Sequence, residues 1–111
     1  GNIVRISIID KADIHEKVSD EDAPKLILYT VYNNLLKKFP ETETIEKKKI
    51  DDRYIMLLKV EKEGQQTMSV GFMSYLKNDK IVTIGYLMPA TDGNDVEKIE
   101  AKLAEVRQNL E

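Results

Sequence analysis

Residues 53–88 read RYIMLLKVEKEGQQTMSVGFMSYLKNDKIVTIGYLM, and this stretch decides the fold. It contains three apolar runs, separated by the polar breaks Glu-Gly-Gln and Asn-Asp. Within a run, apolar side chains recur at every second position: Met56 and Leu58 share one side, and Ile55 and Leu57 share the other. Alternation with a period of two, bounded by turn-forming residues, is typical of neighbouring antiparallel strands. The stretch therefore predicts an antiparallel meander that carries apolar residues on both faces.

Two amphipathic segments flank this meander and can cover it. Pro24–Phe39 has apolar residues at helical spacing, with Asp22 as its predicted N-cap and Pro40 as its stop. The second segment begins at a predicted capping box, Asn94 with Glu97, because these residue types stand three positions apart before an apolar pattern. Its apolar residues form a narrow stripe of Val96, Ile99, Leu103, Val106 and Leu110.

The remaining segments complete one domain over residues 1–111. Ile3–Ile9 is a short β-branched strand, and Asp10–Asp22 is a charged connection. Thr42–Ile50 carries a lysine triplet that suits an edge strand, where charge prevents pairing with another molecule. We therefore predict an α+β fold in the order strand, helix, four strands, helix. It is a two-layer sandwich, an antiparallel sheet with helices packed on one or both faces.

Composition restricts the possible functions. The chain has 41% hydrophobic and 33% charged residues, which is ordinary for a globular domain. A net charge of −3 argues against nucleic-acid binding, which usually depends on a strongly basic surface. No run approaches the ~18 apolar residues of a membrane span. Cysteine is absent, and the chain starts at Gly1, which is typical of an engineered or processed start and leaves room for a removed signal segment.

The glycines of the chain are isolated from one another. None of them opens a predicted helix, so the sequence contains no phosphate-binding loop. Gly71 and Gly85 lie inside predicted strands, where glycine marks a bulge or a close backbone contact.

The residues suited to chemistry do not form a recognisable motif. One connection contains possible cation ligands but lacks the glycine that hard-cation loops use for turning: Asp10, Asp13, His15 and Glu16. The adjacent Asp51 and Asp52 would point to opposite faces of a strand, or bond the local backbone in a turn. Acidic neighbours surround the lysine triplet Lys47, Lys48 and Lys49, which disfavours phosphate binding there. We predict no catalytic, cofactor or metal site and no enzymatic activity.

The order of the segments resembles that of PsbP-like proteins and the related Ran-binding nucleotide release factors. The resemblance runs from ISII through PKLILYTVYNNLLKKF and DDRYIMLLKV to MSVGFMSYLKNDKIVTIGYLMP and the terminal helix. It rests on element order and hydrophobic pattern, so no binding residue of the family is carried over. The family usually has further strands ahead of the position where this chain begins. Cystatin-like and helix-grip folds also wrap a sheet around a helix and remain alternatives.

The resemblance implies a non-catalytic accessory or protein-binding domain, of a kind found at the bacterial cell envelope. The alternative is a carrier of a small apolar ligand, with a pocket between helix and sheet, beside Tyr32 and Phe72. We expect a protein partner or self-association and no nucleic acid. Since uncovered apolar surface marks interaction sites, the candidate interaction surface is Met73, Tyr75 and Tyr86. We expect one core cluster of Leu28, Leu35, Leu58, Val70, Phe72, Ile84, Ile99 and Leu103.

Overall fold

The structure, a computed structural model, describes residues 2–14, 17–61 and 64–111. Its elements follow the predicted order of strand, helix, four strands and helix, with a single 3-10 turn after the first strand. Their bounds are β1 Ile3–Asp10, the turn Lys11–Asp13, α1 Ala23–Lys38, β2 Glu43–Ile50, β3 Arg53–Val60, β4 Met68–Lys77, β5 Lys80–Pro89 and α2 Asp95–Leu110.

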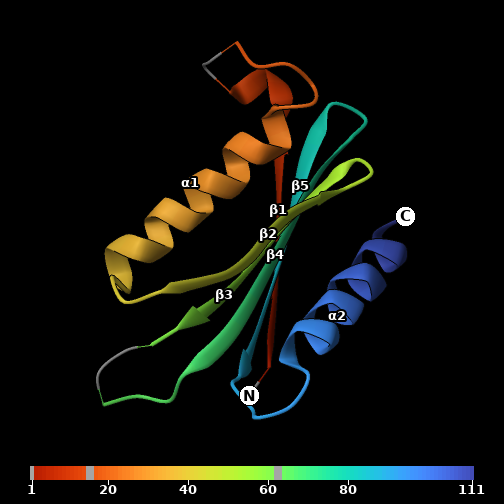
Figure 1. The fold of residues 1–111 in the computed structure, drawn as a ribbon. Coiled ribbons are helices and arrows are strands. Elements are labelled where there is room, and N and C mark those ends of the chain that lie inside the picture. The colour runs from red at the N-terminus through yellow and green to blue at the C-terminus, as the bar shows by residue number, and fades with distance from the viewer. Residues whose placement is uncertain (1, 15–16, 62–63) are drawn as a thin grey trace.

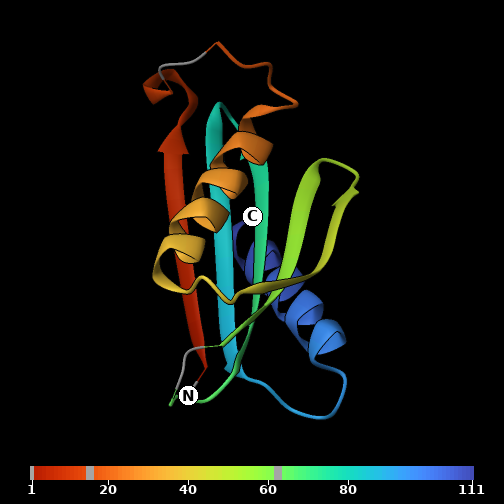
Figure 2. The same ribbon diagram turned by 60° about the vertical axis from the view of Figure 1, so that its left-hand side comes forward.

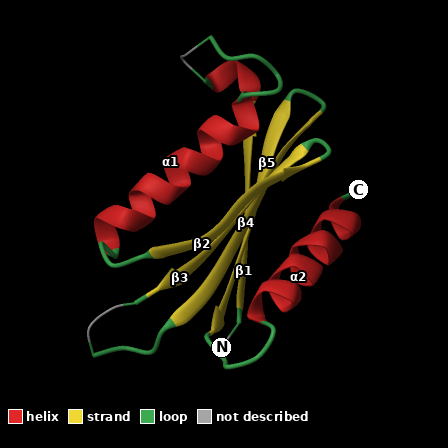
Figure 3. Ribbon diagram, viewed as in Figure 1, coloured by secondary structure: helices red, strands yellow, loops and turns green. Residues whose placement is uncertain are grey.

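The five strands form one antiparallel sheet in the order β1-β5-β4-β3-β2. The helices lie on opposite faces of this sheet, as Figures 1 and 3 show, so the layers are helix, sheet and helix. Consecutive strands β1 and β2 occupy opposite edges, and α1 carries the chain across between them (Figure 2). The α+β class and the element order are confirmed; because each face of the sheet carries a helix, the layers number three and not the two predicted.

The period-two pattern assigns the side chains to the two faces as the sequence predicts. Met56 pairs with Phe72 in the register of β3 and β4, and both belong to the side covered by α1. Ile55 pairs with Met73, and both belong to the side covered by α2. Apolar residues on both faces thus require two helices.

The core is divided into two clusters, which corrects the expectation of a single one. Under α1 lie the buried residues Leu28, Met56, Leu58, Val60 and Val70. Under α2 lie Ile55, Leu57, Met73, Tyr75, Val82, Ile84, Tyr86, Met88, Ile99 and Leu103. Successive side chains of a strand point to opposite faces, so the backbone layer separates the two sets. Of the eight predicted core residues, Leu35 and Phe72 are only half-buried.

Gly71 sets how closely α2 approaches the sheet. A Cβ atom at this position would lie 2.1 Å from Cγ2 of Ile99, so any side chain here would force Ile99 to move. The prediction of a close backbone contact at Gly71 is confirmed. Ile99 rests directly on the β4 backbone, and Val96, Leu103 and Val106 of the α2 stripe pack in the same cluster, whereas Leu110 is exposed.

Neither predicted helix cap forms through the predicted side chain. Asn94 makes no capping hydrogen bond; instead, the Asp95 carboxylate accepts bonds from the Thr91 backbone N–H and the Ser69 hydroxyl, both at 2.8 Å. The Thr91 N–H bond is the main reason why the pKa of Asp95 lies below its usual value. At α1, Asp22 makes no side-chain cap, and its N–H donates to the Ser19 hydroxyl. The side-chain hydrogen bonds at the two helix starts thus involve Ser19, Ser69, Thr91 and Asp95, and neither predicted cap side chain takes part in them.

Candidate functional site

The three residues predicted to form an exposed interaction surface are buried. Met73, Tyr75 and Tyr86 all belong to the cluster beneath α2. The expectation of exposure is therefore wrong, because the α2 stripe covers this face. The Tyr86 hydroxyl accepts a hydrogen bond from the Asn2 side chain at 2.8 Å, at the margin of the cluster.

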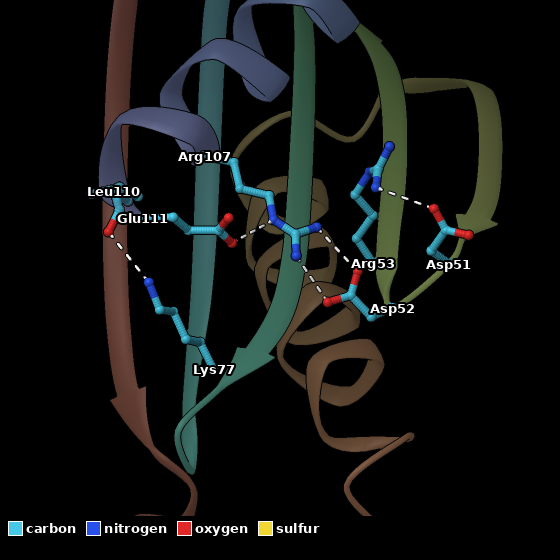
Figure 4. A network of polar contacts seen from close by, with 7 residues as sticks. All are labelled: Asp51, Asp52, Arg53, Lys77, Arg107, Leu110 and Glu111. Atoms are coloured by element: carbon cyan, nitrogen blue, oxygen red, sulfur yellow. Dashed lines mark hydrogen bonds and ion pairs between the residues drawn. The ribbon is translucent and has the colours of Figure 1, made fainter.

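Arg107 fixes the C-terminal part of α2 to the sheet. Its guanidinium donates two hydrogen bonds to the Asp52 carboxylate, at 3.1 and 2.9 Å, and a third to Glu111 at 3.1 Å (Figure 4). It also lies over the Tyr75 ring, 4.2 Å from the centroid. Arg107 lowers the pKa of Asp52, and burial raises the pKa of Tyr75. A paired, fixed carboxylate of this kind is structural.

Asp51 has a different environment from its neighbour. Its backbone φ is 54°, as expected in a tight turn, and its carboxylate lies 3.8 Å from the Arg53 guanidinium. Asp51 and Asp52 therefore contact different arginines, so the pair does not form a shared acid–base site.

The lysine triplet lies on the edge strand β2, as predicted, and each lysine has a partner within the chain. The ammonium of Lys47 lies 5.2 and 5.1 Å from the ring centroids of Tyr29 and Tyr32, in cation–π geometry. Lys48 pairs with Glu100 on α2. Lys49 pairs with Glu21 at 2.6 Å. The triplet thus connects β2 to the layers on both faces.

The opposite edge strand, β1, is the least covered element of the sheet. Val4, Ile6 and Ile8 are 40%, 46% and 57% exposed. They stand in register with the buried residues Tyr86, Ile84 and Val82 of β5, in that order, and so continue the α2-side core beyond the helix. We call Val4, Ile6 and Ile8 the apolar stripe. It is an exposed apolar row beside an outer strand edge that pairs with no other described strand, a combination that favours association.

The other face of β1 borders a groove beneath α1, of about 580 Å³, which we call the α1 groove. Its volume falls within the range of ligand sites. Residues of α1, β1, β4 and β5 line it, with Arg5 and Lys38 as its charged members among the described residues: Arg5, Ile6, Ser7, Val31, Asn34, Leu35, Lys38, Phe39, Val70, Phe72, Thr83, Gly85 and Leu87. Of the two residues expected beside a cavity, Phe72 lines the groove. Tyr32 does not, and its hydroxyl accepts a hydrogen bond from Thr44.

Gly85 shapes the floor of the α1 groove. A Cβ at this position would lie 2.9 Å from Cε1 of Phe72, so the phenyl ring rests against the glycine. This confirms the expected close contact at Gly85. Phe72 is consequently held low on the sheet, where it is half-buried and forms part of an apolar floor with Val70 and Leu87.

The described chain offers neither a metal site nor a helix suited to a membrane. Across the described ranges, no three His, Cys, Asp or Glu side chains gather in a way that could hold a metal ion. Of the four weighed cation ligands, His15 and Glu16 lie outside the described residues. Neither α1 nor α2 combines the length and hydropathy that a membrane-crossing helix needs.

Sequence comparisons leave the family of this chain open, whereas solved structures share its fold. No protein-family model matches the chain, and no curated protein sequence matches it. The Ran-binding protein Mog1p of Saccharomyces cerevisiae is similar in structure, with a TM-score of 0.55 and 15% identity over 94% of this chain. A Mog1 point mutant gives a TM-score of 0.53 and 13% identity over 82% of this chain. This chain spans 55% and 51% of the two solved chains, about half their length. The fold of the chain resembles that of Mog1.

Proposed function

We propose that this chain is a non-catalytic protein-binding domain and that its partner docks on β1. The apolar stripe carries the proposal, because exposed Val4, Ile6 and Ile8 stand on a strand whose outer edge pairs with no strand in the described ranges. An extended segment of a partner can add to such an edge, with main-chain hydrogen bonds supplying affinity and alternate side chains supplying specificity. The similarity in fold to a Ran-binding protein supports a role in protein recognition.

Peptide selection tests this proposal even though the partner is unidentified. A displayed library of random peptides is selected on the wild-type chain, and each selected peptide is then titrated against Ile6→Glu/Ile8→Glu. We expect affinity to fall at least ~10-fold in this variant, because the introduced carboxylates oppose apolar contact. Ile45→Glu is the matched control, since Ile45 is 48% exposed on the other edge strand.

Two outcomes contradict docking on β1. Selected peptides that bind Ile6→Glu/Ile8→Glu as tightly as the wild type would place recognition elsewhere. A selection that yields no peptide dependent on the stripe would remove its main support. Circular dichroism of each variant confirms that the fold is intact.

The α1 groove supports a second candidate function, the transport of a small apolar ligand. Its volume of about 580 Å³ and its floor of Val70, Phe72 and Leu87 suit an apolar molecule. Titration with 1-anilinonaphthalene-8-sulfonate tests this candidate. A blue-shifted, saturable signal that is lost in Val31→Trp, which fills the groove from α1, would favour the carrier. An unsaturable signal would count against it.

A further inference from the structure

We infer that the α1 groove receives an acidic and apolar segment of the protein partner, with an apolar side chain on its floor and carboxylates at Arg5 and Lys38. This inference rests on the proposed function, and it adds the chemistry of the partner. The α1 groove and the apolar stripe flank the same strand, on its two faces. A segment added to β1 therefore has alternate side chains next to the stripe and next to the groove.

Charge is the first argument for an acidic partner. Arg5 extends from β1 and Lys38 from the last turn of α1, so the two cations stand on opposite walls of the groove. No acidic side chain of the described chain lines the groove between them. Within the described ranges, neither cation forms an ion pair. The chain as a whole carries a charge of −3, so this rim differs in sign from its average surface.

A smaller hollow beside the β2 edge provides a comparison, because its cations have partners within the chain. Its volume is about 180 Å³, and its lining includes Lys47, Lys48 and Lys49. All three have partners inside the chain, either tyrosine rings or the carboxylates of Glu100 and Glu21. Among the residues that the structure describes, Arg5 and Lys38 have no comparable partners. Unpaired cations beside an apolar surface favour a partner of complementary charge.

The floor of the groove is the second argument. Phe72 is half-buried, although it lies opposite the fully buried Met56 in the sheet. Its ring rests on Gly85, whose register partner on β1 is Arg5, so the floor meets the β1 edge beside this cation. A large apolar side chain entering from that edge would cover Phe72 and Leu87. Polar groups at the rim and an apolar floor together specify an amphipathic segment.

Fluorescence anisotropy with three labelled synthetic peptides tests the inference. In the first peptide every second residue is leucine and the positions between them alternate leucine with glutamate, so that the side facing the groove carries both. The second peptide has lysine in place of each glutamate, and the third has serine in place of each leucine. We expect the wild type to bind the leucine–glutamate peptide, and to bind the other two at least ~10-fold more weakly. Affinity should also fall as salt rises from ~0.05 to ~0.5 M, because exposed ion pairs are screened.

Charge reversal supplies the decisive variants. Arg5→Glu/Lys38→Glu should weaken binding of the leucine–glutamate peptide at least ~10-fold and strengthen binding of the leucine–lysine peptide. Lys37→Glu is the matched control, because Lys37 is the adjacent cation on α1 and does not line the groove. All three positions are exposed, so the variants should fold, which circular dichroism checks.

The results also separate this inference from the proposed function. If the charge-reversed variant keeps its affinity within ~2-fold, or the wild type prefers the leucine–lysine peptide, the inference is wrong. If selected peptides require Ile6 and Ile8 but ignore the charge reversal, docking on β1 stands and only the acidic chemistry fails. Saturable binding of decanoate without binding of any peptide would assign the groove to a small apolar carboxylate and overturn the inference.

Discussion

The two edges of the sheet are built differently, although each is formed by an eight-residue strand. The β2 edge carries three lysines with internal partners, and its register shifts between Thr44 and Glu46, so Ile45 is left out of the pairing. The β1 edge carries one cation within Ile3–Ile9 and keeps an unbroken register with β5. Charge and bulges prevent edge-to-edge association, whereas a regular apolar edge invites it. This difference is the reason why we propose β1, and not β2, as the docking edge.

The largest expected effect is a difference in the free energy of unfolding between a variant of β3, which lies beside the β2 edge, and a variant of the edge strand β1. Leu57→Ala should lower the free energy of unfolding by about 3 kcal/mol, because Leu57 on β3 is fully buried beneath α2. Ile6→Ala on β1 should cost less than about 1 kcal/mol, since nearly half of this side chain is already exposed. Urea denaturation of both variants measures the difference. Equal losses would show that β1 is covered in solution.

The next effect concerns the floor of the α1 groove. Phe72→Ala should cost about 2 kcal/mol, below the ~3–5 kcal/mol of a fully buried phenylalanine, because the groove leaves the ring half-exposed. Leu58→Ala, on the same face but fully buried, is the reference and should cost more. Urea denaturation gives both values, from the shift of the midpoint when the dependence of the free energy on urea concentration is unchanged. A larger loss for Phe72→Ala would contradict an open groove.

A smaller effect tests the contact that anchors the turn after β2. Asp52→Asn should cost less than about 1 kcal/mol at neutral pH, because the carboxylate is 55% exposed and partly screened. Arg107 lowers the pKa of Asp52 in the folded state. The stabilisation is therefore complete above the unfolded-state pKa of about 3.9 and is lost as the pH falls through the lower, folded-state pKa.

Urea denaturation across acidic pH checks the sign of this dependence. The stabilities of the wild type and Asp52→Asn should converge as the pH falls below about 4. Asp51→Asn is the control, because this carboxylate is 84% exposed and contacts Arg53 only at 3.8 Å. A difference that persists unchanged at the lowest pH would show that the Asp52 carboxylate is not the source of the stabilisation.

The smallest expected change in stability comes from placing a lysine on β1, where β2 already carries three. Ile6→Lys should alter the free energy of unfolding by less than about 0.5 kcal/mol, because the position is exposed. Size-exclusion chromatography over a range of concentrations should nevertheless show less self-association than in the wild type, since an edge lysine opposes pairing. Ile45→Lys is the control and should leave the elution unchanged. Identical elution of Ile6→Lys and wild type at every concentration would indicate that the β1 edge does not self-associate.

Local pattern was sufficient to predict the elements and the faces of the strands. The alternation from Tyr54 to Val60 required only neighbouring residues, and the structure bears it out. The contact between Asp52 and Arg107 could not be predicted, because it joins residues 55 positions apart through the placement of α2. The prediction that Met73, Tyr75 and Tyr86 are exposed was wrong for the same reason. The sequence shows that their face of the sheet is apolar, but it does not show that α2 packs on it.

The sequence pattern shows that the residues of the apolar stripe share one face of a strand, but it does not show that this face is exposed. In IVRISII, the residues Val4, Ile6 and Ile8 alternate with Arg5 and Ser7, which places the three apolar side chains on one face. Their exposure depends on the pairing of β1 with β5 at the sheet margin, a contact between distant parts of the chain. The α1 groove depends on the same pairing and on the course of α1.

The pairing of the first strand with the last one has a consequence for the order of folding. During synthesis β1 leaves the ribosome before the other four strands, yet its neighbour in the sheet, β5, is made after β2, β3 and β4. Closing such a long loop is slow compared with forming the hairpins of the meander. We expect β1 to join a sheet that has already formed, and pulse-labelled hydrogen exchange during refolding should show its amides protected after those of β3 and β4. A nascent chain would then expose IVRISII until β5 has been made, and in that interval a chaperone or another chain can reach it.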